Sequence, residues 1–228
     1  MPLANLSKKQ IRKKKGVIGL IRVATFNDDH LLNLHGKIIE EKFPELKVIT
    51  KCIENQPKGI YSFESEKEAI PKIISTAKIL KTEGVQAIVV SCANDPGVKI
   101  LKKTMKMPII GAGSACASLA FMLGERIGIL GITDFPPSPM VRILGEKLIA
   151  YEKPRNVNTA FDLAKNEQAI FEAAERLISQ DVDVLALGCT GFSTFSMANK
   201  LEERFNVKVI DPVVAAGAYA HYVILMNN

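Results

Sequence analysis

The feature that most restricts the fold of this chain is a pattern of strands and helices that is written twice. Apolar runs with the composition of β-strands begin at Gly16, Leu46, Val85, Pro108, Arg126, Val182 and Val207. Between them lie stretches with helical spacing, such as the apolar stripe Ile170, Ala173, Ala174, Leu177 and Ile178. Strands that alternate with helices predict parallel sheets covered by helices on both faces.

A second apolar stripe predicts another helix and its first turn. The stripe consists of Ile70, Ile73, Ile74 and Ala77. Before it, Ser65 and Glu68 have the spacing of a capping box, so we expect the helix to begin there. Pro71 is expected to kink this helix or to shift its start.

An internal repeat predicts two similar lobes. VIGLI at 17–21 is echoed by RIGIL at 126–130, and MPIIGAGSACASLA at 107–120 is echoed by VKVIDPVVAAGAYA at 207–220. We therefore predict an α/β fold of two pseudo-symmetric lobes, each a parallel sheet flanked by helices, with a site in the cleft between them. Lobe 1 is expected over residues 16–112, completed by a C-terminal helix over 213–228, and lobe 2 over 113–212.

The distribution of charge argues against nucleic acid and membranes as partners. The formal net charge of +6 comes from residues 1–15, which hold six basic residues and no acid. We predict a disordered tail there, followed by a body with balanced charge, which is not typical of nucleic-acid-binding proteins. No apolar run reaches the length of a membrane span.

The four cysteines divide into two groups. Cys52 and Cys116 lie inside strand and helix patterns and are interpreted as packing residues. Cys92 and Cys189 instead follow predicted strands, in VQAIVVSCAND (85–95) and VDVLALGCTGF (182–192). None of the four shows disulfide-type or metal-ligand spacing, so we expect reduced thiols, a cytoplasmic protein and no metal.

The position of Cys92 and Cys189 suggests a reaction. Parallel sheets bind ligands beyond the carboxyl ends of their strands, so two strand-end thiols from facing lobes are predicted to flank one cleft. Nearby backbone N–H groups and helix dipoles are expected to favour the thiolate. One thiolate would remove a proton from a carbon beside a carbonyl, and the opposed thiol would return a proton to the other face. The stereocentre would be inverted without a cofactor.

These motifs resemble those of the aspartate/glutamate/hydantoin racemase superfamily. SCANDPG (91–97) is similar to the first cysteine motif of the hydantoin racemase branch, LGCTG (187–191) is similar to the second, and PIIGAGSACASLAFMLGERIGIL (108–130) resembles the segment that joins the lobes. The resemblance implies an isomerase with Cys92 and Cys189 as its acid–base pair, which acts on a small molecule of the hydantoin type. It also implies a substrate pocket lined by Ser91, Ala93, Thr133, Thr190 and Gly191.

Two departures from the family pattern bear on the substrate. The branch often has an Asn-Pro-Asn-Thr turn after the first strand, whereas this chain has ATFNDD, in which only Asn27 or Asp28 is a loose match; we take Asn27 as the candidate site residue. Gly191 stands where the glutamate racemase branch usually has a histidine, which favours a cyclic ureide over an acidic amino acid. Amino-acid racemases and related decarboxylases or isomerases remain alternatives, because one scaffold hosts several reactions. We also expect a homo-oligomer.

Two non-catalytic interpretations compete with these. GAGSAC (111–116) lies between a predicted strand and a predicted helix, as a dinucleotide-binding motif would, although its third glycine is missing. A two-lobed protein that only binds a small molecule would need neither thiol. His30, His35 and His221 form no triad with the cysteines and are interpreted as structural or surface residues.

Overall fold

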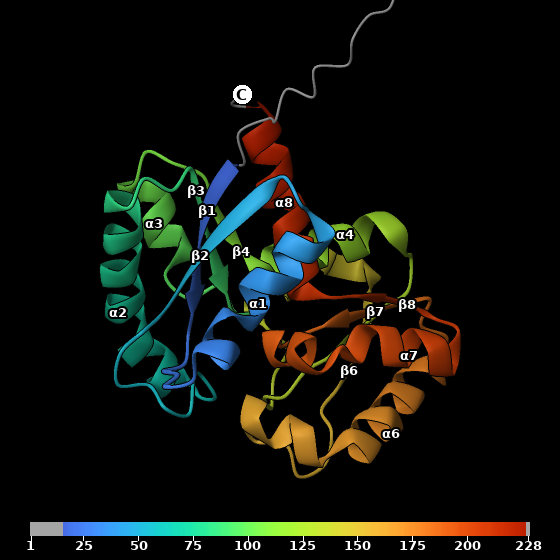
Figure 1. Cartoon of the computed structure of the whole chain (residues 1–228). Helices are drawn as coiled ribbons and strands as arrows, with labels where there is room; N and C mark the ends of the chain where they lie inside the picture. Colours follow the sequence, from blue (N-terminus) through green and yellow to red (C-terminus); the bar gives the residue numbers. More distant parts are fainter. Residues whose placement is uncertain (1–15, 227–228) are drawn as a thin grey trace, which may run out of the picture.

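In the computed structural model, residues 16–226 are described, and they form two four-stranded parallel sheets with helices on their faces (Figure 1). The first sheet has the order β2-β1-β3-β4 and the second the order β6-β5-β7-β8. The strands are β1 Gly16–Arg22, β2 Leu46–Cys52, β3 Ala87–Ser91, β4 Ile109–Gly111, β5 Ile127–Leu130, β6 Leu148–Glu152, β7 Val184–Leu187 and β8 Lys208–Ile210. The same strand order in both sheets confirms the predicted α/β fold of two similar lobes.

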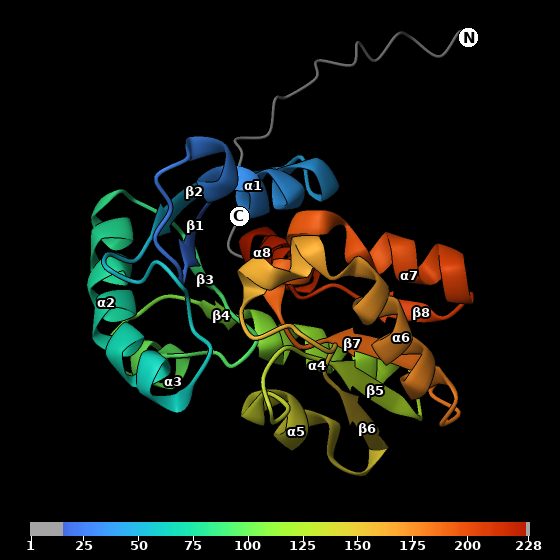
Figure 2. The same cartoon turned by 90° about the horizontal axis from the view of Figure 1, so that it is seen from below.

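Helices cover both faces of each sheet (Figure 2). Their bounds are α1 Asp29–Lys42, α2 Phe63–Thr82, α3 Val98–Thr104, α4 Ala112–Leu123, α5 Ser138–Leu144, α6 Glu167–Ile178, α7 Met197–Phe205 and α8 Pro212–Met226. Short 3-10 helices are η1 Gly145–Lys147, η2 Ala160–Lys165 and η3 Thr190–Phe195. Buried residues of α2 and α3 pack on one face of the first sheet, and those of α6 and α7 on one face of the second.

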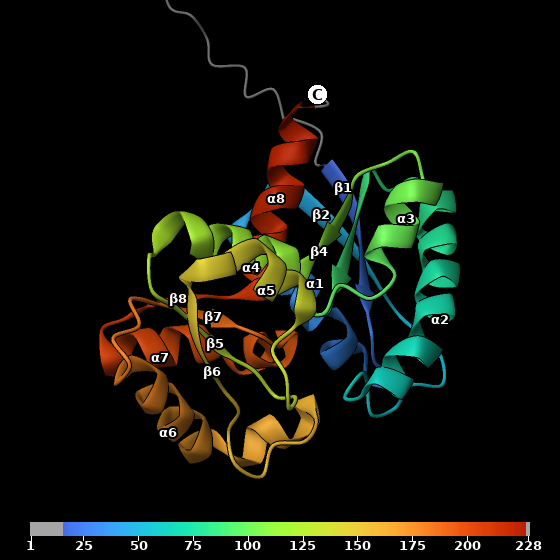
Figure 3. The same cartoon turned by 180° about the vertical axis from the view of Figure 1, so that it is seen from behind.

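The largest core lies between the two sheets. It joins buried residues of α1, α4, α5 and α8 to the inner faces of both sheets. Small side chains on α4 and α8, such as Ala115, Ala117, Ala216 and Ala220, let these helices approach each other closely (Figure 3). Because α4 and α8 both contact strands of the first lobe and elements of the second, the lobe boundaries at residues 112 and 212 stay a prediction.

Two details of the secondary structure differ from expectation. The edge strand β6 was not predicted, because its residues are all partly exposed and show no alternation of buried and exposed positions. The capping box predicted at Ser65 and Glu68 is wrong, since α2 begins at Phe63 with Ser62 as its N-cap. The hydroxyl of Ser65 accepts from the N–H of Ser62 at 2.8 Å, so Ser65 is the N3 residue of the capping box and not its N-cap. The helix continues through Pro71.

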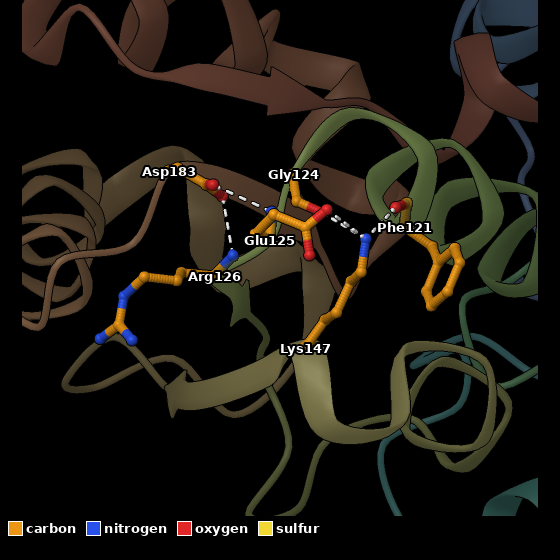
Figure 4. Close-up of polar contacts among 6 residues, drawn as sticks. All are labelled: Phe121, Gly124, Glu125, Arg126, Lys147 and Asp183. Carbon is orange, nitrogen blue, oxygen red and sulfur yellow. Dashed lines mark hydrogen bonds and ion pairs between the residues drawn. The ribbon is translucent and has the colours of Figure 1, made fainter.

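Polar contacts fix the connection from α4 to β5 (Figure 4). Lys147 Nζ donates to the carbonyl oxygens of Phe121 and Gly124, each at 3.0 Å, and pairs with Glu125 at 2.9 Å. The carboxylate of Asp183 accepts from the backbone N–H of Glu125 at 2.9 Å and from that of the next residue at 3.1 Å. The start of β5 is therefore held by Lys147, which precedes β6, and by Asp183, which precedes β7.

The predicted tail over residues 1–15 and the last two residues of the predicted C-terminal helix lie outside the described residues. Within 16–226, no helix is both long and apolar enough to cross a membrane.

Candidate active site

A cavity of about 840 Å³ lies at the carboxyl ends of the strands and is lined by residues of both lobes. Cys92 follows β3 and Cys189 follows β7, the third strand in the order of each lobe, and both cysteines line this cavity. Neither is in a disulfide, and each residue is partly exposed as a whole. The two strand-end thiols therefore share one cavity.

The structure places most of the other predicted site residues in the same cavity. Ser91, Ala93, Thr133, Thr190 and Gly191 all line it. Asn27 does not, because it is exposed in the loop between β1 and α1. The next residue, Asp28, caps α1 by accepting from the N–H of His30 at 2.6 Å, and the loop residues that line the cavity are Val23, Ala24 and Phe26.

The thiols differ from expectation in their acidity. Burial raises the pKa of Cys92 well above its ordinary value and raises the pKa of Cys189 to about 11. The sequence-based expectation that a helix N-terminus lowers the pKa of at least one of these thiols is therefore wrong. Backbone N–H groups do act in that direction, since Gly191 N donates to Cys189 Sγ at 3.3 Å, but the loss of hydration outweighs them. The nearby charge of Arg22 also favours the thiolate of Cys189.

Alkylation should reveal this difference between the thiols. We expect iodoacetamide to modify Cys189 before Cys92, with a rate that rises about tenfold per pH unit between about pH 8 and pH 10, because its thiolate is a minor species below a pKa of about 11. Mass spectrometry of quenched samples measures this. Cys116 is the control, since it is sealed in the core with its thiol directed to the carbonyls of Leu187 and Ile210. Faster modification of Cys92 would contradict the prediction.

His35 is a site residue that the sequence did not predict. It lies on α1, is 1% exposed and lines the cavity. Its Nδ1 is 2.9 Å from the hydroxyl of Ser91, beside Cys92, and its Nε2 is 3.1 Å from the hydroxyl of Thr194 in η3, the short helix that follows Cys189. Burial lowers the pKa of His35 well below its ordinary value, so the ring is neutral and one nitrogen donates while the other accepts.

A second hydrogen bond joins the same two turns. The hydroxyl of Thr190 donates to the carbonyl oxygen of Ser91 at 3.1 Å, in a buried position. Ser91 precedes Cys92 and Thr190 follows Cys189, so the bond links the residues next to the two thiols. We call these contacts of Ser91, His35, Thr190 and Thr194 the inter-lobe tie. It holds one cysteine turn against the other.

Arg22 is a further cavity residue that the sequence did not indicate. It ends β1, is 7% exposed and donates through Nη1 to the carbonyl oxygens of Leu31 and Leu32 at 2.7 and 3.2 Å. The ring of Phe26 lies against its guanidinium, 4.4 Å from centroid to carbon. Burial lowers the pKa of Arg22 to about 10, which leaves it charged at neutral pH.

Asp95 explains the glycine-rich segment after β4. Its carboxylate accepts from the backbone N–H of Gly113 at 2.8 Å and from that of Ser114 at 2.9 Å, at the start of α4. A dinucleotide would need these same groups for its phosphates. The glycines provide close packing instead, because a Cβ on Gly113 would come within 1.7 Å of the carbonyl oxygen of Ala93. This arrangement favours a structural role over nucleotide binding.

The rest of the cavity is largely apolar. Phe26 of the first lobe and Phe161 of the second face each other with ring centroids 6.2 Å apart, and further lining residues include Ile60, Tyr61, Ile132 and Phe195. No cluster of three or more potential metal ligands occurs among the residues that the structure describes. The groups that line the cavity can therefore move protons, donate hydrogen bonds and enclose an apolar substituent.

Comparison with known proteins places this arrangement among relatives. Residues 36–220 match the model of a family described as Asp/Glu/Hydantoin racemase. A hydantoin racemase of Rhizobium meliloti is 30% identical over 173 residues, which cover 70% of this chain and 69% of the relative. A hydantoin racemase of Pseudomonas sp. (strain NS671) is 28% identical over 181 residues, covering 74% and 70%.

A solved structure shares the fold. The structure of allantoin racemase from Klebsiella pneumoniae superimposes with a TM-score of 0.82, covering 93% of this chain and 89% of that chain at 19% identity. At this identity the likeness concerns the fold alone.

Proposed function

Because the chain belongs to the Asp/Glu/hydantoin racemase family, we propose that it is a cofactor-independent racemase or epimerase with Cys92 and Cys189 as its two proton-transfer groups. The preferred substrate class is a five-membered cyclic ureide of the hydantoin type. A homo-oligomeric state and a cytoplasmic location are part of the proposal. The observation that carries it is the presence of both strand-end thiols in one cavity, one from each lobe.

The proposed reaction is a pair of proton transfers. The thiolate of one cysteine takes the proton from the ring carbon beside the carbonyl, and the electrons of the broken C–H bond move onto the carbonyl oxygen. The opposed thiol then gives its proton to the other face of the same carbon, the carbonyl re-forms, and the thiol becomes a thiolate. The product has the opposite configuration, and the two cysteines have exchanged protonation states.

The electrostatics of the cavity support a starting state. Cys189 is the more acidic thiol, helped by the N–H of Gly191 and by the charge of Arg22, so the reactive fraction of the free enzyme is expected to carry its thiolate on Cys189 and a proton on Cys92. A raised pKa makes this thiolate scarce but strongly basic, which suits the removal of a weakly acidic C–H proton. In this protonation state the enzyme converts one enantiomer. With the thiolate on Cys92 and the proton on Cys189 it converts the other.

The size and lining of the cavity support a ring with an apolar substituent. A volume of about 840 Å³ exceeds the needs of a bare five-membered ring, and aromatic side chains of both lobes provide an apolar wall. Gly191 in place of a histidine weakens the case for aspartate or glutamate. Amino acids and a related decarboxylation or isomerisation are the second candidates, since they need the same carbanion-type intermediate.

Solvent isotope exchange tests the proposal. We expect the protein to racemise a single enantiomer of a 5-substituted hydantoin in D₂O, with deuterium entering at C5 and appearing in the product enantiomer before the remaining substrate, because inversion uses a solvent-derived proton from the opposed thiol. Optical rotation and proton NMR measure the two processes. A double variant with Cys92→Ala and Cys189→Ala controls for spontaneous exchange, and dialysis against a chelator should change nothing.

A pure binding protein would leave C5–H untouched. If neither exchange nor racemisation exceeds the double variant across hydantoins and amino acids, the proposal is wrong.

A further inference from the structure

The cavity contains a buried positive charge that forms no ion pair with a carboxylate of the described residues. None of the ion pairs among residues 16–226 includes Arg22, although its side chain is 7% exposed. Its hydrogen bonds and ring contact are to uncharged groups, namely the carbonyl oxygens of Leu31 and Leu32 and the face of Phe26. Its charge also acts on the thiolate of Cys189, which is a minor species at neutral pH. A buried charge without a counter-ion is costly, so such a group usually serves a ligand or a reaction.

The free donors of Arg22 open into the cavity. Nη1 makes both hydrogen bonds, which leaves the N–H groups on Nε and Nη2 without a protein acceptor. Among the described residues, the fully buried side-chain nitrogen and oxygen atoms without a hydrogen-bond partner are Thr50 Oγ1 and His221 Nε2, and no nitrogen of Arg22 belongs to this group. The free nitrogens of Arg22 are therefore accessible, and Arg22 lines the cavity. A guanidinium with donors on adjacent nitrogens suits the two oxygens of a carboxylate.

The other charged groups of the cavity do not neutralise Arg22. Asp134 is paired with Lys153 at 2.9 Å, and Glu66 accepts from the side-chain amide of Asn94. Lys58 also lines the cavity, but it is an exposed cation at the outer surface. Neither carboxylate forms an ion pair with Arg22, and of these four charged groups Arg22 is the buried one.

We propose that Arg22 binds a carboxylate of the substrate, so that the natural substrate is a carbonyl compound, preferably a cyclic ureide, whose substituent ends in a carboxylate. This inference rests on the proposed function for the identity of the reacting ring. The ring would lie between Cys92 and Cys189 with its carboxylate against the free N–H groups of Arg22. A neutral ring with a purely apolar substituent would leave these N–H groups without an acceptor.

A matched pair of ligands tests the proposal. Hydantoin-5-acetic acid and hydantoin-5-acetamide share the ring and differ in charge at neutral pH. By calorimetric titration at about pH 7, we expect the acid to bind the wild-type protein roughly 10- to 100-fold more tightly than the amide, as for a hydrogen-bonded charge pair. Arg22→Gln should abolish this preference. Arg22→Lys keeps the charge without the paired donors and should retain only part of it.

Lys58→Gln is the matched control, because it removes one positive charge from the same cavity and should preserve most of the preference. The proposal is overturned if no preference for the acid exists in the wild type, if Arg22→Gln keeps it, or if Lys58→Gln loses as much as Arg22→Gln. Should Arg22→Gln fail to fold by thermal melting, Arg22→Lys decides, and an unchanged preference in that variant counts against the proposal.

The same samples separate this inference from the proposed function. Deuterium uptake at C5 of either compound reports proton transfer, whereas the acid-to-amide affinity ratio reports the carboxylate site. A preference for the acid without any uptake would leave the Arg22 site standing and remove the two-thiol reaction. Uptake without a preference would do the reverse.

Discussion

Replacing Cys189 by alanine is expected to reduce racemisation in both directions by about 10²- to 10⁴-fold, because inversion needs a base on one face of the carbon and an acid on the other. The same loss is expected for Cys92→Ala. The remaining cysteine can still remove and return a proton on its own face. Each variant should therefore slowly exchange one enantiomer in D₂O with retention of configuration, and the two variants should prefer opposite enantiomers.

The control for this pair is Cys52→Ala. Cys52 ends β2 and does not line the cavity, so its loss should leave racemisation close to the wild-type rate. Chiral chromatography measures inversion, and NMR measures exchange. If both variants exchange the same enantiomer, or if either keeps near-full racemisation, the assignment of two opposed proton-transfer groups is wrong and a one-cysteine mechanism takes its place.

Replacing His35 by alanine should uncouple proton removal from proton return. The imidazole joins Ser91 and Thr194 at 2.9 and 3.1 Å, and its loss leaves one buried and one partly buried hydroxyl without that partner. A displacement of one thiol relative to the other by about 1 Å can cost roughly 10²-fold in rate. We expect racemisation to fall roughly 10- to 100-fold and exchange at C5 to fall less, so that more exchange events occur per inversion.

The ratio of exchange to inversion distinguishes positioning from simple destabilisation, which would lower both rates together. His35→Gln should restore part of the ratio, since an amide can both donate and accept. His221→Gln is the matched control, because His221 packs on Phe43 and does not line the cavity. Since the pKa of His35 is strongly lowered, the ring stays neutral, and the activity should show no step from His35 between about pH 6 and pH 8. An unchanged ratio in His35→Ala would contradict this role.

The sequence was informative where function depends on local pattern. The strands before Cys92 and Cys189 were recognisable because an apolar run followed by a small residue and a polar turn is a short, contiguous signal. The two similar lobes were recognisable from the internal repeat, but the order of the strands within each sheet was not predicted. The pKa direction of these thiols was not predictable, because it depends on how much of the surrounding chain excludes water.

Residues joined only by the tertiary fold were not predictable. His35 is 56 positions from Ser91 and 159 from Thr194, so no local spacing connects it to either cysteine turn. Arg22 looks in sequence like a charge at the end of a strand, and its burial arises because α1 and Phe26 fold over it. Asn27 was chosen by analogy with another turn sequence, and the cap made by Asp28 turns it to solvent.

The contact between Gly113 and Ala93 has a consequence for how such chains can diverge. Any amino acid other than glycine at position 113 would place its first side-chain carbon 1.7 Å from the carbonyl oxygen of Ala93, directly beside Cys92. A substitution of Gly113 would therefore displace the turn that holds Cys92, although Gly113 itself lies on α4 and takes no part in the reaction. In a lineage that retained the reaction, the helix start and the cysteine turn would have to change together. A glycine at this place can thus serve as a sequence marker for an intact first turn in distant homologues.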